Sequence, residues 1–262
     1  MTSVVEDVWG ELARLTPARI ALGRSGVGLP TREVLRFSLA HAKARDAVHT
    51  ALDADAVEAA IAALGFGTLR ATSAAPARDA YLRRPDLGRR LSDDSRAALT
   101  ERAATPCDLA FVVADGLSSS AVAAQAEPFL AAMKPWIAAA GWSVAPVAVA
   151  TQARVAIGDE VGELLQARAV VVLIGERPGL SSPDSLGAYL TIDPKPGRND
   201  GQRNCISNIR PDGLSFELAA FKLSWLIEQA LKRALTGVKL KDESDLMLVA
   251  GRPPAPALPA AQ

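Results

Sequence analysis

Short runs of residues that are apolar at every position recur in the second half of the chain. The clearest reads Ala-Val-Val-Val-Leu-Ile over residues 169–174, and a comparable run covers residues 108–114. A strand that is apolar at every residue, and not only at alternate residues, is typical of a parallel sheet with helices on both faces. Amphipathic stretches separate these runs, so the pattern predicts a Rossmann-like, doubly wound α/β sheet.

The expected strands and helices alternate along this part of the chain, as in βαβ units. We expect strands at residues 108–114, 144–149, 169–174, 188–192 and 205–209. We expect helices at residues 121–140, 159–166 and 215–235, the first of them despite Pro128 and Pro135. Residues 96–250 are therefore predicted to form the α/β domain.

Residues 1–95 are predicted to form a mainly helical N-terminal region. Residues 6–15 suit a short amphipathic helix that could dock on the body of the protein or on a partner. A glycine-rich loop follows at residues 23–30. A second helix starts at Thr31, a suitable N-cap, and its apolar positions continue to Ala47, with basic residues on its other face. An alanine-rich stretch of less regular pattern completes the region.

Residues 251–262 form a segment rich in proline and alanine. Proline removes a backbone donor and fixes φ, so this segment suits neither a helix nor a sheet. We expect a disordered tail and assign it no function.

Composition narrows the possible functions. The 262 residues carry 29 Lys and Arg against 29 Asp and Glu, so the chain lacks the basic excess that nucleic-acid binding requires. No segment reaches the roughly 20 apolar residues of a membrane-spanning helix, and the first residues are acidic where a secretion signal is basic. Cys107 and Cys205 lie far apart without a Cys or His at metal-ligand spacing, which favours free thiols. These features predict a cytoplasmic protein with no nucleic-acid or membrane partner and no metal ligands of its own.

The sequence contains none of the common catalytic motifs that we considered. Gly23, Gly26 and Gly28 lack the order of the dinucleotide fingerprint and follow no expected strand, and neither a P-loop nor a G-x-S-x-G elbow occurs. The two histidines, His41 and His49, belong to the N-terminal region, where we expect them to be packing or surface residues. The acidic pairs at 93–94 and 159–160 suit the first turns of helices. We therefore expect no catalytic residue in this chain.

Polar turns follow the carboxyl ends of several expected strands. They are residues 115–118, 154–156 and 175–177, with 204–205 beyond them. Ligands of α/β proteins bind at this edge of the sheet, and several converging turns suit a large ligand better than a catalytic triad. The turn directly after the run at 169–174 contains Glu176 and Arg177. The residues alone leave two interpretations of it open: a cofactor or partner surface, or an ion pair between Glu176 and Arg177 on the surface.

Three segments carry a resemblance to a known family. Residues 175–185 read Gly-Glu-Arg-Pro-Gly-Leu-Ser-Ser-Pro-Asp-Ser, residues 204–210 read Asn-Cys-Ile-Ser-Asn-Ile-Arg, and residues 16–24 read Thr-Pro-Ala-Arg-Ile-Ala-Leu-Gly-Arg. Over roughly residues 16–243 the chain resembles the small subunit of adenosylcobalamin-dependent ethanolamine ammonia-lyase. The resemblance implies a carbon–nitrogen lyase that is active only as a complex with a larger, barrel-shaped subunit. That enzyme converts ethanolamine to acetaldehyde and ammonia, with the cobalamin between the subunits and ethanolamine bound mainly by the large one.

The resemblance also implies that Val155, Glu176 and Cys205 contact the cobalamin. By residue type, Val155 would offer an apolar surface to the corrin or its nucleotide loop. Glu176 would accept hydrogen bonds from peripheral amide or hydroxyl groups, and the backbone near Cys205 would approach the macrocycle. Some cobalamin enzymes ligate cobalt through a histidine in an Asp-x-His-x-x-Gly motif. This motif is absent here, so we expect neither histidine to bind cobalt.

Two other functions stay open on the pattern of the chain. One is a nucleotide-dependent oxidoreductase, which the missing fingerprint opposes, and the other is a non-catalytic protein that stabilises a larger partner. The place of the protein within the cytoplasm is also open. Some family members carry a longer N-terminal extension thought to direct them into a bacterial microcompartment, whereas the similar part of this chain begins near Leu12.

Overall fold

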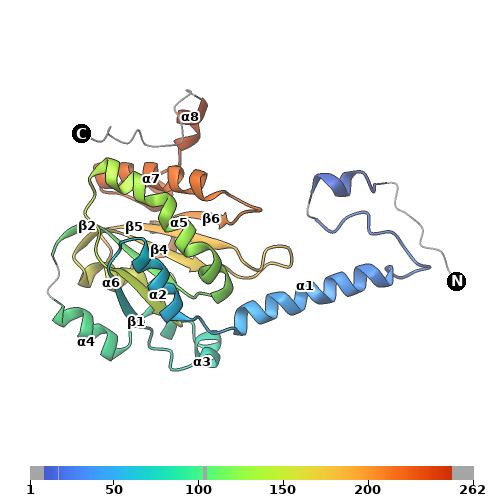
Figure 1. Cartoon of the computed structure of the whole chain (residues 1–262), viewed down its shortest axis with the longest axis horizontal. Coiled ribbons are helices and arrows are strands. Elements are labelled where there is room, and N and C mark those ends of the chain that lie inside the picture. The colour runs from blue at the N-terminus through green and yellow to red at the C-terminus, as the bar shows by residue number, and fades with distance from the viewer. Residues whose placement is uncertain (1–8, 17, 103–104, 250–262) are drawn as a thin grey trace.

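A six-stranded sheet forms the centre of the body in the computed structural model, which describes residues 9–16, 18–102 and 105–249 (Figure 1). The strand order is β1-β3-β2-β4-β5-β6. The strands are β1 (Thr68–Thr72), β2 (Cys107–Ala114), β3 (Val147–Thr151), β4 (Ala167–Gly175), β5 (Leu186–Ile192) and β6 (Asn204–Ile209). The four strands β1, β3, β2 and β4 are parallel, whereas β5 runs antiparallel to both of its neighbours.

Helices cover both faces of this sheet. The longer helices are α1 (Thr31–His49), α2 (Ala54–Ala63), α4 (Asp93–Glu101), α5 (Ser119–Ala140), α6 (Ile157–Leu164) and α7 (Phe216–Arg233). Shorter helical segments are η1 (Leu12–Leu15), α3 (Arg78–Arg83), η2 (Leu87–Arg89), η3 (Asp200–Gln202), η4 (Gly237–Lys239) and α8 (Ser244–Val249). Figure 1 shows α5 and α7 side by side on one face.

The apolar runs of the central strands explain this layering. In β2, Phe111 and Val113 pack with α2, α5 and α7 in one core, while Val112 packs with α4 and α6 in a second core. All side chains of residues 109–114 are completely buried. The interpretation of these runs as strands covered on both faces is therefore confirmed.

The expected α/β architecture is present between residues 107 and 235. Every strand and helix predicted there occurs, with ends within three residues of the predicted bounds. The antiparallel edge formed by β5 and β6 differs from an all-parallel sheet. Its cause lies in the connections, because residues 176–185 and 193–203 contain no α-helix and a parallel crossover needs about a dozen residues or more, usually a helix.

The prediction of a mainly helical region over residues 1–95 needs one correction, because β1 lies there and belongs to the sheet. This edge strand is five residues long, and only Leu69 and Ala71 point into the core. Arg70 between them points outward to Asp55 and Glu58. An alternation of apolar and polar residues over so short a segment does not distinguish a strand from a loop in the sequence.

The remaining predictions for both ends of the chain concern helices and the tail. The helix from Thr31 is α1, although Pro30 and not Thr31 is its N-cap. Of the helix expected at residues 6–15, the structure describes η1. Residues 1–8 and the tail at 251–262 lie outside the described residues.

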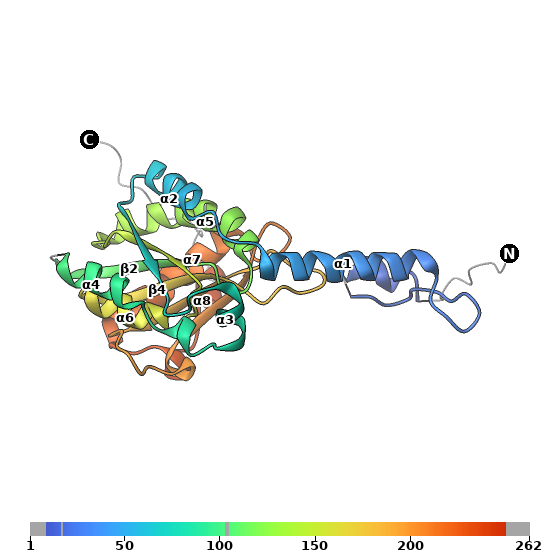
Figure 2. The ribbon, with the colours of Figure 1, turned by 90° about the horizontal axis from the view of Figure 1, so that it is seen from below.

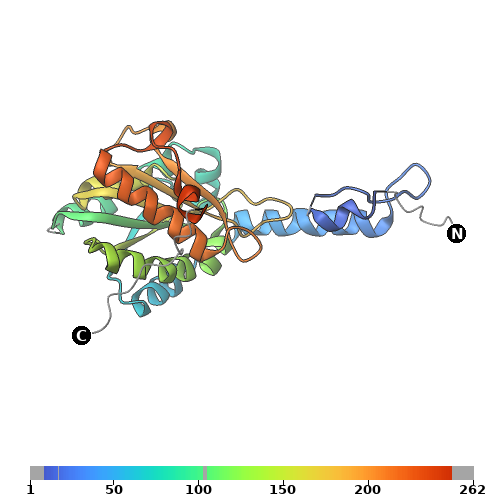
Figure 3. The same cartoon turned by 90° about the horizontal axis from the view of Figure 1, so that it is seen from above.

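An arm projects from the body and consists of α1 and the segment before it (Figures 2 and 3). The preceding segment runs back along the outer half of α1, and the Arg19 guanidinium lies 5.8 Å from the centre of the Phe37 ring. Within the described ranges, no helix is long and apolar enough to cross a membrane.

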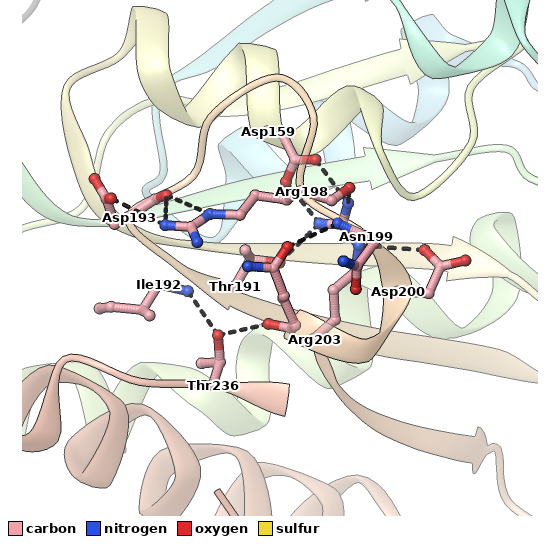
Figure 4. A network of polar contacts seen from close by, with 10 residues as sticks. Asp159, Thr191, Ile192, Asp193, Arg198, Asn199, Asp200, Arg203 and Thr236 are labelled. Atoms are coloured by element: carbon pink, nitrogen blue, oxygen red, sulfur yellow. Dashed lines mark hydrogen bonds and ion pairs between the residues drawn. The ribbon is translucent and has the colours of Figure 1, made fainter. Parts of the chain in front are cut away.

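A buried ion pair joins the antiparallel edge to the helix α6 (Figure 4). The two Nη atoms of Arg203 donate to the two carboxylate oxygens of Asp159 over 2.6 Å each. The other donors of Arg203 reach Thr191 Oγ1 at 2.9 Å, the Arg198 carbonyl at 3.0 Å and Asp200 at 3.4 Å. Both paired side chains are at most 2% exposed. Each buried charge is therefore compensated by its partner and not by solvent.

We expect Arg203→Met to lower the free energy of unfolding by roughly 3–5 kcal/mol, because it leaves the Asp159 carboxylate buried without a partner. The double variant Arg203→Met/Asp159→Leu should recover at least half of that loss. Guanidinium unfolding followed by circular dichroism measures both. As a control, Arg168→Met breaks a more exposed pair with Asp108 and should cost less than about 1 kcal/mol. A similarly small loss for Arg203→Met would show that the buried pair contributes little.

Candidate functional site

A pocket of about 400 Å³ opens at the carboxyl ends of the central parallel strands. Three turns line it, namely Gly116 and Leu117 after β2, Arg154 and Val155 after β3, and Gly175 to Arg177 at the end of β4. Tyr81 and Tyr189 complete the lining together with Ile174. The turns at 115–118, 154–156 and 175–177 therefore do converge at one edge of the sheet, as the sequence predicts. Residues 204–205, which the sequence pattern groups with them, instead begin the strand β6 and do not line the pocket.

Two glycines allow the turns after β2 and β4 to approach each other closely. The Leu117 amide donates to the Gly175 carbonyl at 2.9 Å. A Cβ atom at Gly116 would clash with the Gly175 carbonyl, and a Cβ at Gly175 would clash with the Ser118 carbonyl. Gly116 also has φ +56°, a conformation that side chains other than glycine rarely adopt. This contact sets the position of Glu176, the next residue along the chain.

Asp115 ties the turn after β2 to the turn after β3. Its carboxylate is 2% exposed and accepts hydrogen bonds from the amides of Gln152 and Ala153, each at 2.9 Å. Arg78 donates to the same carboxylate at 3.2 Å. The backbone that leads into Arg154 and Val155 is therefore held from the adjacent strand.

Tyr81 forms the floor of the pocket beneath two guanidinium groups. Arg154 and Arg78 lie 4.3 and 4.7 Å from the centre of its ring, and its hydroxyl donates to the Ala153 carbonyl at 3.2 Å. Burial raises the pKa of Tyr81 to about 12, so the hydroxyl is neutral at physiological pH. Arg154 Nε is buried without a hydrogen-bond partner, and no carboxylate of the described chain pairs with this guanidinium. The pocket thus contains an unsatisfied cationic donor.

Glu176 is held by the neighbouring strands and not by Arg177. Its amide donates to the Ser185 carbonyl at 3.0 Å, and Oε2 accepts hydrogen bonds from the Ser185 hydroxyl and from the Asn208 amide at 3.3 Å. Oε1 lies beside Gly187, where a Cβ atom would approach it to 2.9 Å. Across the residues that the structure describes, Oε1 accepts no hydrogen bond and Glu176 forms no ion pair with Arg177. One carboxylate oxygen of Glu176 therefore has no hydrogen-bond partner within the described chain.

Cys205 lies one strand away from the pocket. It is the register partner of Tyr189 across β5 and β6, and Tyr189 lines the pocket. Although the residue as a whole is exposed, its thiol lies against Tyr189, and this local burial raises the pKa of Cys205. The charge of Glu176 raises it further, whereas the Tyr189 hydroxyl opposes the shift. Of the three residues implied by the resemblance, Val155 and Glu176 thus line one pocket and Cys205 borders it.

The other candidate residues of the sequence lie elsewhere. His41 and His49 are exposed on α1 and do not line the pocket. The pair at 93–94 lies in the first turn of α4, as expected. The pair at 159–160 lies in the first turn of α6, but Asp159 binds Arg203 and Glu160 binds Arg96 at 2.6 Å, so interaction with the helix dipole is only part of its role. Within the described ranges, no group of three or more His, Cys, Asp or Glu residues could hold a metal ion.

Sequence reasoning missed Tyr81, Arg78 and Tyr189 as parts of the site. Tyr81 and Arg78 belong to α3, which ends at Arg83, well before β2 begins at Cys107, and reaches the pocket only through the tertiary fold. Tyr189 lies in the middle of the mostly apolar strand β5, opposite Val172 of β4, and its side chain lines the pocket. A polar aromatic residue in such a strand is the one local signal that pointed to the site.

Comparison with known proteins gives matches along most of the chain. The family model described as ethanolamine ammonia-lyase light chain (EutC) matches residues 6–241. A protein of Pseudomonas syringae pv. tomato named ethanolamine ammonia-lyase small subunit is 56% identical over 91% of this chain and 84% of its own length. Proteins with the same name from Xanthomonas campestris pv. campestris and Ralstonia nicotianae are 55% and 54% identical, each over 95% of this chain and over 92% and 94% of their own lengths.

We expect the Cys205 thiol to react with iodoacetamide at higher pH than free cysteine does. A raised pKa keeps the thiol neutral at pH values where free cysteine is already partly ionised, and only the thiolate reacts. The rate is measured against pH in a Cys107→Ser background, which leaves Cys205 as the reporting thiol. Glu176→Gln removes the nearby negative charge and should move the midpoint to lower pH. A midpoint at or below that of free cysteine contradicts this description of the thiol.

Proposed function

The chain belongs to the ethanolamine ammonia-lyase light chain family, and we propose that it binds adenosylcobalamin at an interface with a large subunit. The assembled enzyme would convert ethanolamine to acetaldehyde and ammonia, with ethanolamine bound mainly by the large subunit. The observation that carries the proposal is the pocket in which Val155 and the free carboxylate oxygen of Glu176 lie together.

We also interpret the sheet as Rossmann-like and doubly wound. The chain leaves β2 toward β3 on one side of it and returns from β3 to β4 on the other side, so the order reverses around β2. The helices of these two connections, α5 and α6, pack into the two cores on opposite faces. Ligands of such sheets bind outside the carboxyl ends of the strands where the order reverses, and the pocket lies there.

The residues of the pocket suit a large cofactor with both apolar and polar parts. Val155 and Tyr189 provide apolar surface, the free oxygen of Glu176 is an acceptor, and Arg154 Nε is a buried donor without a partner. The lining of the pocket contains two guanidinium groups, Arg154 and Arg177, and one carboxylate, Glu176, so an anionic group of the ligand would be favoured. Amide, hydroxyl and phosphodiester groups at the periphery of cobalamin meet these requirements.

The size of the pocket supports a place between two subunits. Pockets for drug-sized ligands measure about 300–1,000 Å³, and adenosylcobalamin is larger than such ligands. A pocket of about 400 Å³ therefore accommodates one part of the cofactor. The rest must lie against another surface, which in this proposal belongs to the large subunit.

This chain would bind, orient and shield the cofactor and leave the substrate chemistry to its partner. Val155 packs against an apolar edge, Glu176 accepts hydrogen bonds, and the strand at Cys205 closes one side. When bound, adenosylcobalamin supplies a radical by homolysis of its cobalt–carbon bond. The arginines and neutral tyrosines of the pocket are poor proton acceptors at neutral pH, and Glu176 already accepts two hydrogen bonds.

We assign the cofactor contacts to residues 96–250, place the protein in the cytoplasm, and leave enclosure in a microcompartment open.

We expect activity to require three components: this chain, the large subunit and adenosylcobalamin. The measurement is acetaldehyde formation from ethanolamine by each component alone, by each pair and by the full mixture. Only the full mixture should be active, because the pocket of this chain offers no acid–base constellation of its own. Acetaldehyde formed by this chain with the cofactor alone would contradict the proposal.

We expect Glu176→Ala to weaken cofactor binding by the assembled enzyme about tenfold to a hundredfold. Cofactor donors left unpaired in a buried interface cost roughly 1–3 kcal/mol, which corresponds to that range. Glu176→Gln keeps an acceptor and should lose less. Affinity is measured from the absorbance change of the cofactor on titration.

The matched control is Glu163→Ala, which removes an exposed carboxylate of α6 that forms no ion pair within the described chain. Its cofactor affinity should equal that of the unsubstituted protein. Equal affinity of Glu176→Ala and Glu163→Ala in the assembled enzyme would exclude Glu176 as a cofactor contact.

A further inference from the structure

Large apolar side chains are exposed on the N-terminal arm far more than elsewhere on the described chain. Of twelve such exposed residues, ten precede residue 40, and the other two are Val238 and Leu246. Scattered exposed apolar residues are normal, whereas a concentration on one segment marks a site of interaction. The arm is therefore a candidate docking element.

The helix α1 contributes little to the body of the protein. None of its side chains belongs to either hydrophobic core, and its buried residues are Glu33 and Ala47. Its C-terminal end is attached by hydrogen bonds from Arg78 to the Val48 carbonyl at 2.7 Å and from Ser119 to the Thr50 carbonyl at 2.8 Å. The rest of α1 extends away from the sheet (Figures 2 and 3).

Two of the exposed apolar residues of α1, Leu35 and Leu39, share one stripe of the helix with the half-buried Ala42. Leu35, Leu39 and Ala42 follow one another at intervals of four and three residues, which places them on one stripe of the helix. Leu35 is 64% exposed and Leu39 is 57% exposed. Lys43 lies beside this stripe by the same helical geometry, as does Arg32, which also pairs with Glu33 at 2.9 Å. Helices in proteins are stabilised mainly by packing of an apolar face, and no residue of this stripe belongs to either hydrophobic core of the described chain.

The arm leaves the body at the same edge of the sheet as the pocket. Arg78, which holds the end of α1, also binds Asp115 beneath the pocket. Arg19 of the segment that lies along α1 donates to the Leu180 carbonyl at 3.2 Å, in the loop that follows Glu176. A partner that covers the pocket therefore meets the arm on the same side of the molecule.

We propose that the stripe of Leu35, Leu39 and Ala42 docks in an apolar groove of the large subunit that is bordered by acidic side chains. This inference rests on the proposed function, because the partner that covers the pocket is the large subunit. An amphipathic helix in a groove is a common mode of recognition, and Arg32 and Lys43 supply the charge that acidic borders would complement. At 19 residues the helix spans about 28 Å, enough to reach well beyond the pocket.

The test measures the affinity of the full chain for the purified large subunit by biolayer interferometry, without cofactor. The variant Leu35→Asp/Leu39→Asp should bind at least about a hundredfold more weakly, since it places two charges in the centre of the interface. Leu35→Ala/Leu39→Ala keeps good helix formers and should weaken binding about tenfold or more. The control Val238→Asp/Leu246→Asp alters two apolar residues that are even more exposed, at 80% and 68%, and should bind as the unsubstituted chain does.

Thermal unfolding and circular dichroism check that each variant is folded, which we expect because the substituted residues lie outside both cores. Reversal of charge in Arg32→Glu/Lys43→Glu should also slow association and reduce its dependence on salt. Binding of the leucine variants at the affinity of the unsubstituted chain overturns the proposal.

Two further measurements separate this inference from the proposed function. At concentrations of the large subunit high enough to force assembly, the leucine variants should regain cofactor binding, whereas Glu176→Ala should assemble normally and bind cofactor weakly. If the unsubstituted chain fails to bind the large subunit, the proposed function itself fails. If it binds, but the leucine substitutions only convert a dimer of this chain to a monomer in analytical ultracentrifugation, the stripe serves a second copy and the docking proposal is wrong.

Discussion

The ion pair between Arg203 and Asp159 fixes the antiparallel edge of the sheet against α6. Two side chains that are almost completely excluded from solvent share a bidentate contact, and the remaining donors of Arg203 are also used. A buried charge is tolerated only with such complete pairing. Val155 lies four residues before Asp159 and Cys205 two residues after Arg203, so this contact also sets the distance between the two sides of the candidate site.

Next to the ion pair between Arg203 and Asp159, the pocket is formed by contacts between backbone segments more than by side-chain packing. The close approach of Gly116 and Gly175 joins the turns after β2 and β4, and Asp115 joins the turns after β2 and β3. The backbone turns of the site are therefore held in place by contacts within this chain. Two residues that line the pocket keep a polar atom without a hydrogen-bond partner in the described chain, Nε in Arg154 and Oε1 in Glu176, which suits a site that is completed by a cofactor.

The arm and the pocket together suggest how a light chain of this family works as part of an assembly. Membership of the family is established over residues 6–241, while the cofactor contacts and the docking of α1 are our proposals. The hydrogen bonds of Arg78 connect the two regions, since this residue holds both the end of α1 and Asp115. Docking of the arm would then bring the large subunit over the pocket in a defined orientation.

The sequence by itself determined the elements whose pattern is local. Continuous apolar runs predicted β2 and β4, amphipathic periods predicted α5 and α7, and short motifs identified the family. It did not reveal β1, whose five residues give too short a pattern, or the antiparallel direction of β5 and β6. Only the tertiary structure brought Tyr81 under Arg154 and paired Arg203 with Asp159 across 44 residues of chain. Such contacts depend on how distant segments pack. A periodic pattern of apolar residues is local, so it does not specify which charged residues will pair with each other in the interior.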